Sequence, residues 1–428
     1  MNRSQLVISS VNQPVVPSVL EQHAEEAAGL YSTRTALLRL STTTLYSLRK
    51  LDDRLAAHLD GLATAGEAGW RFHEAGLEQP TQGSLFCAAV RAIENRQAAT
   101  LDKVLALSAA SPRMRAAVAG AFEWVAADTL QGIGARLLVS PDPFARLTGV
   151  GACASHRIDP GPSLTQWALD DDPGVRARAL RAGGELGRLD LIPACAAAID
   201  GDAVGCQTWG AWSSVLFENR GRALEVLLRT AFTPGSVGMH AFRLALQAMN
   251  TTAAHAWLQE IARDPRRLRW LIQGSGIAGD PVYVPWLIKQ MDDASTARVA
   301  AEAFTLITGV DLAATGLEGS QPQGFEAATS DNPDDEGVDM DPDEGLPWPD
   351  VSKIRTWWQD NANQFPHGSR SFMGAPVTRE HCIEVLKTGY QRQRTLAAHY
   401  LCLLEPGTPL FNTSAPAWRQ QKLLAQLK

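Results

Sequence analysis

The chain has 428 residues, a formal net charge of −7 and 45% hydrophobic residues. These values provide for a sizeable core and argue against a general nucleic-acid-binding protein, which would neutralise many phosphates with Lys and Arg. No stretch of about 18 uninterrupted apolar residues occurs, and no basic region followed by an apolar run opens the sequence. We therefore expect a cytoplasmic protein that does not enter a membrane.

The first predicted elements are two long helices between about residues 18 and 61. Leucines recur in the second helix at steps of three and four, which places them on one face. Such a short stripe is typical of a core seam, whereas a coiled-coil interface needs more heptads. We assign residues 1–80 to an N-terminal helical cap, which would cover the open hydrophobic end of a repeat array. The leucines are Leu45, Leu48, Leu51, Leu55, Leu59 and Leu62.

A segment similar to D-P-x-x-R-x-x-A recurs at intervals of about 30 residues through the middle of the chain. In its clearest copy Asp172 is placed to cap a helix and Pro173 to occupy the first turn of that helix. Gly187 is placed to end the helix, and Pro193 lies in the opening turn of the next one. A period of this length indicates stacked helix pairs. The predicted fold is therefore all-α, with a HEAT-like α-solenoid of antiparallel helix pairs over residues 81–311.

The segment 312–349 is rich in Asp, Glu, Gly and Pro and contains no Lys or Arg. Such a composition predicts an acidic, flexible, disordered insertion, because it cannot bury enough apolar area to order itself. Asp339, Asp341 and Asp343 have the spacing of a calcium loop, but Glu344 stands where that loop requires Gly. A solvated acidic linker is the alternative.

Helical sequence resumes after the insertion, and residues 350–428 are assigned to a C-terminal helical block. Several segments across the chain resemble an uncharacterised bacterial family of HEAT-like repeat proteins, some members of which are encoded near type VI secretion genes. The resemblance implies a genomic neighbourhood and no established activity. The segments are 51–62, Trp357-Trp358, 370–374, 389–398 and 415–420.

Motifs of catalysis are absent from the sequence, which has no HExxH, no GxSxG, no P-loop and no GxGxxG opening a helix after a strand. The six cysteines form no CxxC pair, so we interpret them as small buried residues in a reducing compartment. His381-Cys382 and His399 with Cys402 could approach one another in the last helix pair. Without a carboxylate at defined spacing they are better interpreted as packing residues, and we expect no cofactor or metal.

Arginines and tryptophans, which are frequent at interaction hot spots, supply the candidate partner-binding residues. One group combines four arginines with a tryptophan within a single repeat, and the others lie after the acidic segment. Arginine clusters also form solvated surfaces or bonds between repeats, and tryptophans also fill gaps between stacked helices. The candidates are Arg263, Arg266, Arg267, Arg269, Trp270, Trp357, Trp358 and Arg370.

Two functions from different classes remain. The first is a noncatalytic protein–protein interaction scaffold, an adaptor, effector chaperone or immunity protein of a type VI secretion cluster, with a secreted effector or spike component as partner. The second is a HEAT-like enzyme such as a DNA glycosylase or a cofactor lyase, which needs a basic groove holding a carboxylate and a Trp together. The acidic composition favours the first and makes a nucleic-acid partner less suitable. An acidic surface suits an immunity protein for a basic toxin, whereas an adaptor needs two separate surfaces.

Overall fold

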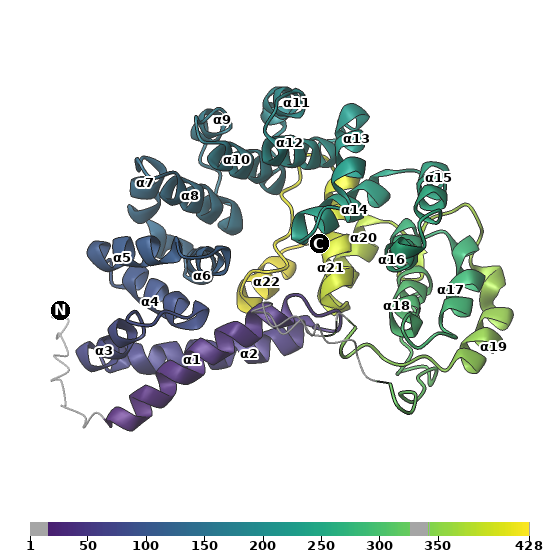
Figure 1. Cartoon of the computed structure of the whole chain (residues 1–428), viewed down its shortest axis with the longest axis horizontal. Coiled ribbons are helices and arrows are strands. Elements are labelled where there is room, and N and C mark those ends of the chain that lie inside the picture. Colours follow the sequence, from purple (N-terminus) through teal and green to yellow (C-terminus); the bar gives the residue numbers. More distant parts are fainter. Residues whose placement is uncertain (1–15, 326–340, 342, 428) are drawn as a thin grey trace, which may run out of the picture. The chain divides into compact units, whose positions relative to one another are not determined.

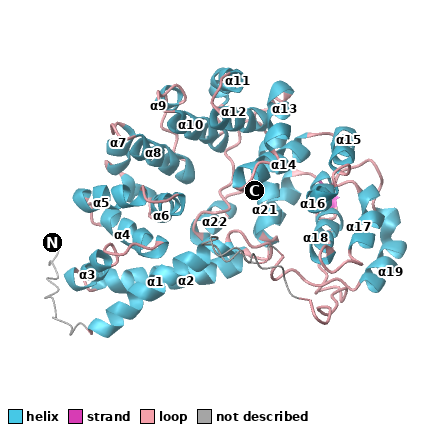
Figure 2. Ribbon diagram, viewed as in Figure 1, coloured by secondary structure: helices cyan, strands magenta, loops and turns pink. Residues whose placement is uncertain are grey.

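The computed structural model describes residues 16–325, 341 and 343–427. Within these residues the chain is almost entirely helices and loops, which confirms the predicted all-α class (Figure 2). The only strands among them are the antiparallel pair β1 (Ser371–Phe372) and β2 (Ala375–Pro376). None of the described helices combines the length and the hydropathy of a membrane span.

The helices follow one another along the chain as labelled in Figure 1. They are α1 (Pro17–Leu37), α2 (Leu45–Thr64), α3 (Glu67–Ala75), α4 (Gln82–Glu94), α5 (Ala98–Ser108), α6 (Pro112–Trp124), α7 (Ile133–Leu138), α8 (Pro143–His156), α9 (Ser163–Trp167), α10 (Pro173–Leu186), α11 (Ile192–Asp200), α12 (Val204–Leu216), α13 (Gly221–Thr230), α14 (Ser236–Ala248), α15 (Thr251–Ile261), α16 (Leu268–Ala278), α17 (Val284–Gln290), α18 (Ala297–Thr308), α19 (Val351–Asn361), α20 (Arg379–Thr388), α21 (Gln391–Leu404) and α22 (Ala417–Leu424).

The described residues form two compact units. Unit 1 comprises those up to Arg34 together with Lys50–Thr129, and unit 2 comprises Thr35–Arg49 and those from Leu130 onward. Unit 1 thus extends past residue 80, which we predicted from the sequence as the end of the N-terminal helical cap. The reason is that α3, α4, α5 and α6 pack on one another, so the first helix pairs of the predicted array belong to this unit.

The leucine stripe of α2 is part of the core. In unit 1, Leu55 and Leu62 are fully buried, and Leu51 and Leu59 are 8% exposed. The spacing of three and four residues therefore marks a buried face, as the sequence indicated.

A buried ion pair joins the first two helices of unit 1. Arg34 Nε donates to Asp52 Oδ1 at 2.7 Å, and the Asp52 side chain is fully buried. The guanidinium of Arg34 also lies 5.6 Å from the ring centroid of Trp124. Because a buried carboxylate is costly without a partner, this pair fixes how α1 and α2 pack within the unit.

Unit 2 contains a row of helices, α8, α10, α12, α14, α16 and α18, in which each member packs on the next (Figure 1). We call these six helices the helix row. A further helix packs beside each member: α7 on α8, α9 on α10, α11 on α12, α13 on α14, α15 on α16 and α17 on α18. The period of about 30 residues therefore corresponds to one member of the row with its neighbour.

The recurring Asp-Pro segment begins helices as the sequence predicted. Asp172 Oδ1 accepts hydrogen bonds at 2.9 Å from two main-chain N–H groups of the first turn of α10, and Pro173 occupies that turn. Asp142 caps α8 in the same way. Gly187 ends α10 with φ of 71°, and Pro193 lies in the first turn of α11.

The arginine of the same segment stabilises the turn before its own helix. Arg146 and Arg176 each donate through Nη1 to main-chain carbonyls of that turn. Arg146 also pairs with Asp170, which precedes the next member of the row, through Nε at 3.0 Å and Nη2 at 2.9 Å. One residue of the motif thus links two neighbouring members of the helix row.

Residues 369–416 pass along the C-terminal ends of several helices of the row. Gly187, Gly279 and Gly309 end α10, α16 and α18 with φ of 71°, 74° and 72°. A Cβ atom at any of the three would lie 2.1 to 2.4 Å from a main-chain oxygen of this segment. At Gly279 the contact includes a hydrogen bond, in which Ser371 N donates to the glycine carbonyl at 2.8 Å. Glycine is required here for both backbone conformation and space.

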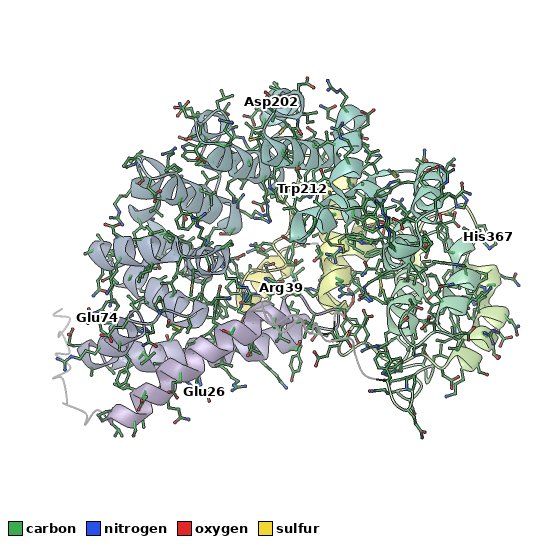
Figure 3. All side chains as sticks on the ribbon, viewed as in Figure 1. Glu26, Arg39, Glu74, Asp202, Trp212 and His367 are labelled. Carbon is green, nitrogen blue, oxygen red and sulfur yellow. The ribbon has the colours of Figure 1, made fainter. Side chains whose placement is uncertain are left out.

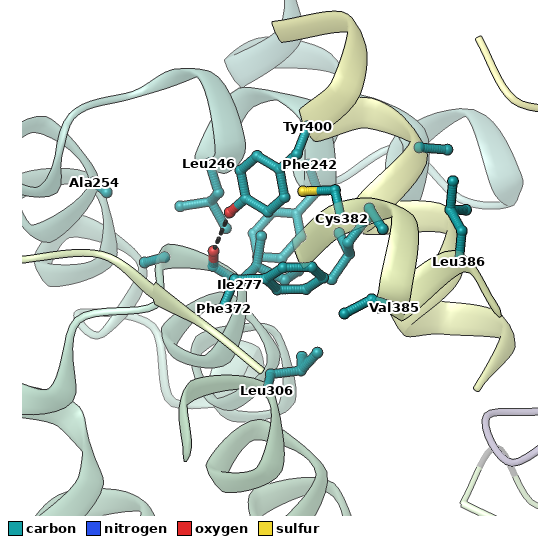
Figure 4. Packing of buried hydrophobic residues seen from close by; sticks show 14 of the residues in the cluster. Phe242, Leu246, Ala254, Ile277, Leu306, Phe372, Cys382, Val385, Leu386 and Tyr400 are labelled. Atoms are coloured by element: carbon teal, nitrogen blue, oxygen red, sulfur yellow. Dashed lines mark hydrogen bonds between the residues drawn. The ribbon is translucent and has the colours of Figure 1, made fainter. Parts of the chain in front are cut away.

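The core of unit 2 joins the helix row to the C-terminal helices. Phe242, Ile277 and Leu306 of the row pack against Phe372 and Tyr400 (Figure 4). The Tyr400 hydroxyl donates to the carbonyl of Ile277 at 3.5 Å. The C-terminal helices are therefore packed into the same core as the helix row.

The prediction that 312–349 is a disordered insertion is wrong for the described parts of this segment. Leu312, Leu317 and Leu346 are 2%, 6% and 8% exposed. Glu318 forms an isolated antiparallel bridge with Pro349. Residues 326–340 and 342, on which part of the prediction falls, lie outside the described residues.

Two aspartates of this segment are bound by arginines of the helix row. Arg298 Nη2 donates to Asp341 at 2.6 Å, and Arg269 Nη1 donates to Asp343 at 2.8 Å. The Arg298 guanidinium also lies 4.6 Å from the ring of Trp348. The composition suggested disorder, but a few buried leucines and two carboxylates paired with arginines hold the described part of this acidic segment against the helix row.

Candidate functional site

A cavity with a volume of about 330 Å³ lies within unit 2. Its walls come from α10, α12, α14 and α21, from the segment 410–414, and from residues next to α1 and α8. We call it the arginine pocket; Figure 3 labels two of its residues, Arg39 and Trp212. The lining residues are Leu38, Arg39, Arg157, Arg181, Glu185, Trp212, Ser236, Met239, His240, Arg243, Gln391, Arg392, Thr395, Ala398, His399, Leu410, Phe411, Asn412, Thr413 and Ser414.

The pocket is strongly positive although the chain is acidic. Five arginines line it and one glutamate, Glu185, accompanies them. The surplus of positive charge contrasts with the formal net charge of −7 of the whole chain. Walls of low dielectric strengthen such a local potential, so the pocket favours an anionic occupant. The arginines are Arg39, Arg157, Arg181, Arg243 and Arg392.

Glu185 is held as a carboxylate by two arginines of its own helix. Arg178 Nη1 donates to Oε2 and Arg181 Nε donates to Oε1, both at 2.9 Å. Burial raises the pKa of Glu185, but Arg178, Arg181 and Arg157 outweigh it and lower the pKa to about 2. The carboxylate therefore stays ionised at neutral pH, and both of its oxygens accept hydrogen bonds from arginines.

Arg243 on α14 and Arg392 on α21 also line the pocket, and they differ in their bonding partners. Arg392 Nη1 donates to Glu302 at 2.7 Å. Within the described residues Arg243 takes part in no hydrogen bond or ion pair. Burial, followed by the charge of Arg392, lowers the pKa of Arg243 to about 10, so it remains protonated at neutral pH. Arg243 is therefore the guanidinium best placed to bind an incoming anion.

Two histidines of the pocket are kept neutral. His399 Nδ1 lies 3.0 Å from Gln247 Oε1, so this nitrogen carries the proton and donates. Burial, followed by Arg243, lowers the pKa of His399 to about 3. For His240, burial, Arg181 and His399 lower the pKa to about 3 as well. Both imidazoles therefore stay uncharged at neutral pH.

Aromatic rings support the charged groups. The Arg181 guanidinium lies 4.4 Å from the ring centroid of Trp209, which packs against His240 and Trp212. Trp212 is 2% exposed, and its Nε1 finds no hydrogen-bond partner among the described residues. His240 Nδ1 is likewise buried without one. Unsatisfied polar atoms of this kind are uncommon in protein cores and mark the pocket as a site with unused hydrogen-bonding capacity.

The predicted cluster around Trp270 lies elsewhere in unit 2. Arg263 pairs with Glu260, and Arg266 with Asp264 at 2.9 Å, on exposed surface. Arg267 lies over the ring of Phe232 at 4.0 Å. Trp270 itself is partly buried and packs edge-to-face on Phe242 and Phe232. Arg269 is turned to Asp343, so the structure does not bring all five residues to one surface.

The other predicted partner residues serve packing or main-chain contacts. Trp358 is 8% exposed, and Trp357 packs edge-to-face on Phe304. Arg370 donates to main-chain carbonyls at the ends of α14 and α16, among them Ala278 O at 3.0 Å.

The two His-Cys pairs of the C-terminal block have separate hydrogen bonds. His381 Nε2 donates to Phe372 O at 2.8 Å, and Cys402 Sγ donates to a main-chain carbonyl. Burial raises the pKa of Cys382 and Cys402 to about 12, which makes both poor nucleophiles. Five of the six cysteines are buried.

No group of three or more His, Cys, Asp or Glu residues with metal-binding geometry is found in the described part of the chain. Of the calcium-loop candidates, Asp339 lies outside that part, and Asp341 and Asp343 bind arginines.

The arginine pocket itself was not anticipated from the sequence. Its charged groups come from five separate parts of the chain between Arg39 and Arg392, and these parts meet only through tertiary packing. The sequence shows Arg181 about 30 residues from Trp209 and Trp212, and nothing in it indicates that they face one cavity. Comparison of the chain with protein-family models and with curated proteins finds no match.

Proposed function

We propose that this chain is a noncatalytic interaction protein that holds an acidic group of another protein in the arginine pocket. The observation that carries the proposal is the fixed charge of the site. Arg243 is protonated, Glu185 is ionised, and His240 and His399 are neutral across the physiological range. A group that transfers protons works best when its pKa is near the working pH. These groups instead suit the constant recognition of negative charge.

The surroundings of the pocket define the kind of acidic group. Arginine pairs with carboxylates in a fork of two hydrogen bonds, which gives both strength and orientation. A cavity of about 330 Å³ accepts a few side chains at most. A broadly acidic protein would be repelled by a chain of net charge −7, so a short acidic loop or chain terminus is the better occupant.

The wider role follows from the sequence resemblance. We propose that the helix row is a HEAT-like α-solenoid and that the protein is an accessory of a type VI secretion cluster, binding an effector or spike component. Among the three accessory roles, a positive pocket suits an adaptor or effector chaperone, which must hold a segment of its cargo. An immunity protein for a basic nuclease would instead present acidic groups.

One observation favours the enzyme alternative. The arginine pocket places the carboxylate of Glu185 and the indole of Trp212 together in basic surroundings, the combination that a DNA glycosylase would need. The ion pairs that Glu185 forms with both Arg178 and Arg181 argue against an enzyme. They make the Glu185 carboxylate a weak base. Incubation with alkylated DNA separates the two functions: base release that Glu185→Gln abolishes would support the enzyme.

The proposal is tested with a fluorescent decapeptide containing four consecutive glutamates, titrated by anisotropy against the full chain. We expect Arg243→Gln to weaken binding by about tenfold, the equivalent of one charged hydrogen bond. The matched control is Arg229→Gln, an exposed arginine of the neighbouring α13, which should change affinity less than about twofold. Equal affinities of the two variants would overturn the proposal, and thermal melting checks that both remain folded.

A further inference from the structure

Arg243 of the arginine pocket also lines a second, smaller cavity of unit 2. This cavity has a volume of about 20 Å³, and its walls come from α14, α16, α18 and α21. Three residues, Met239, Arg243 and Arg392, line both cavities. The two cavities therefore share a wall, and Arg243 is part of it.

The smaller cavity is mainly apolar, and we call it the apolar hollow. Its apolar lining residues are Met239, Ile277, Val299, Ala303, Leu306 and Leu396. Ile277 and Leu306, labelled in Figure 4, belong to the core that joins the helix row to the C-terminal helices. A cavity needs about 10 to 15 Å³ to hold one water molecule, and a methyl group is of similar size. The hollow thus has room for a small apolar side chain.

The charged groups around the apolar hollow leave one guanidinium available. Arg392 Nη1 donates to Glu302 at 2.7 Å, so these two side chains neutralise each other. Arg243 takes part in no hydrogen bond or ion pair within the described residues, and its pKa of about 10 keeps it protonated at neutral pH. An anion bound to Arg243 in the arginine pocket therefore lies next to the apolar hollow.

Trp212 gives the arginine pocket a second unused hydrogen-bond donor. The residue is 2% exposed, and its Nε1–H has no partner in the part of the chain that the structure describes. The Cζ3 edge of the indole faces α10, since a Cβ atom at Gly184 would lie 2.9 Å from Cζ3. Nε1 lies on the opposite edge of the ring. Because a buried N–H group without a partner is costly, the pocket favours an occupant that brings acceptor oxygens as well as charge.

The adjacency of an anion site and an apolar site selects the C-terminal residue of a polypeptide. In that residue the carboxylate and the side chain share one Cα atom, so they can enter two neighbouring cavities together. In Asp and Glu the carboxylate ends the side chain, and an apolar group must come from another residue. A chain terminus also enters a pocket of about 330 Å³ as a single strand, whereas a loop needs room for two.

We infer that the arginine pocket and the apolar hollow together bind the C-terminal residue of a partner protein, with its carboxylate at Arg243 and a small apolar side chain, such as that of alanine, in the hollow. The inference rests on the proposed function and names the acidic group that the pocket holds. A partner recognised in this way needs no other acidic residue, which avoids repulsion by a chain of net charge −7.

The test uses four fluorescent octapeptides, titrated against the full chain by anisotropy. They share seven uncharged residues and end in Ala with a free carboxylate, in Ala amide, in Gly with a free carboxylate, or in Asp amide. We expect amidation of the Ala peptide to weaken binding at least about tenfold, the loss of a hydrogen bond between charged groups. The Gly peptide should bind about fourfold more weakly than the Ala peptide, the loss of one buried methyl. Asp amide should bind no better than Gly, because its side-chain carboxylate leaves the hollow empty.

Arg243→Gln should remove the preference for the free carboxylate over the amide. Arg229→Gln, on the exposed face of α13, is the matched control and should retain it, and thermal melting checks that both variants are folded. Equal affinities of the wild type for the Ala peptide and its amide, or for the Ala peptide and Asp amide, would overturn the inference. Displacement of the Ala peptide by inorganic phosphate more readily than by acetate, at constant ionic strength, would assign the pocket to a phosphoryl group and also overturn it.

The inference and the proposed function fail in different ways. The acidic decapeptide, prepared with an amidated C-terminus, reports on the proposed function alone. If it binds through Arg243 while the Ala peptide and its amide bind equally, the proposed function stands and the inference falls. If Arg243→Gln weakens the binding of neither peptide, the proposed function falls and the inference falls with it.

Discussion

Arg243 on α14 acts on His399 on α21 across the arginine pocket. Together with burial, which has the larger effect, its positive charge lowers the pKa of the His399 imidazole to about 3. The two helices also share a hydrogen bond between Gln247 and His399 at 3.0 Å. A neutral histidine beside a permanent cation makes the stability of this site depend on pH.

Acidification should destabilise the folded protein below about pH 6.5. The unfolded histidines, with a pKa near 6.5, then bind protons that His240 and His399 cannot bind until about pH 3. The free energy of unfolding therefore falls with decreasing pH, by about 2 kcal/mol per buried histidine between pH 7 and 5. Glu185, with a pKa of about 2, adds to the loss only below about 4.5.

Urea unfolding at pH 7 and pH 5 measures this dependence. His399→Gln should reduce the loss of stability between pH 7 and 5 by about 2 kcal/mol, whatever its effect at pH 7, since glutamine does not titrate and His240 still does. The exposed His367 supplies the control, and His367→Gln should leave the dependence as in the wild type. An unchanged pH dependence in His399→Gln would contradict the assignment.

The buried pair Arg34–Asp52 should be sensitive to loss of either partner. Asp52→Ala leaves the Arg34 guanidinium in a site where its carboxylate partner was fully buried, which costs about 3 to 5 kcal/mol. Glu26→Ala removes an exposed partner of Arg54 at 3.9 Å and should cost less than about 0.5 kcal/mol. Chemical denaturation compares the two, and a loss below about 1 kcal/mol in Asp52→Ala would exclude the expected role.

Gly187→Ala should destabilise unit 2 beyond the cost of its backbone conformation. Its φ of 71° costs an alanine about 1 kcal/mol, and the added Cβ would lie 2.1 Å from the Gly407 carbonyl oxygen. Gly132→Ala isolates the first effect, because Gly132 has φ of 80° and open space around it. The difference in free energy of unfolding should be about 1 to 3 kcal/mol. Equal losses would mean that Gly407 moves aside freely.

Leu317→Ala tests whether the first part of the acidic segment is docked. Leu317 is 6% exposed and packs in the core around α17 and α18, so truncation should cost about 2 to 5 kcal/mol. Leu423, 36% exposed, provides the control, and Leu423→Ala should cost less than about 1 kcal/mol. If Leu317→Ala were as mild, the segment would behave as the free linker that its composition suggested.

Local sequence signals predicted local structure well in this chain. Asp172, Pro173 and Gly187 have the cap, first-turn and end positions that the repeat indicated, because these depend on a few neighbouring residues. The all-helical class and the buried leucines of α2 follow from periodicity in the same way. The acidic segment misled because composition averages over residues, while docking depends on particular ones such as Leu312 and Asp343.

The candidate site was beyond the reach of such signals. Arg39, Arg181, Arg243 and Arg392 converge through packing of α10, α14 and α21, and nothing in their neighbours marks them. Conversely, the adjacency of Arg269 and Trp270 in sequence suggested a common surface. Consecutive residues of a helix point in directions about 100° apart, so one turns to Asp343 and the other to the core.

The passage of residues 369–416 along the ends of earlier helices sets an order of events during synthesis. Gln247 and Leu396, which hydrogen-bond to each other, are 149 residues apart, so α14 leaves the ribosome long before α21 exists. Until then the nascent helices keep their glycine-capped ends and apolar contacts with Tyr400 uncovered. The arginine pocket is thus incomplete in unfinished chains, because Arg392, His399 and the segment 410–414 are synthesised after the helices that form its other walls.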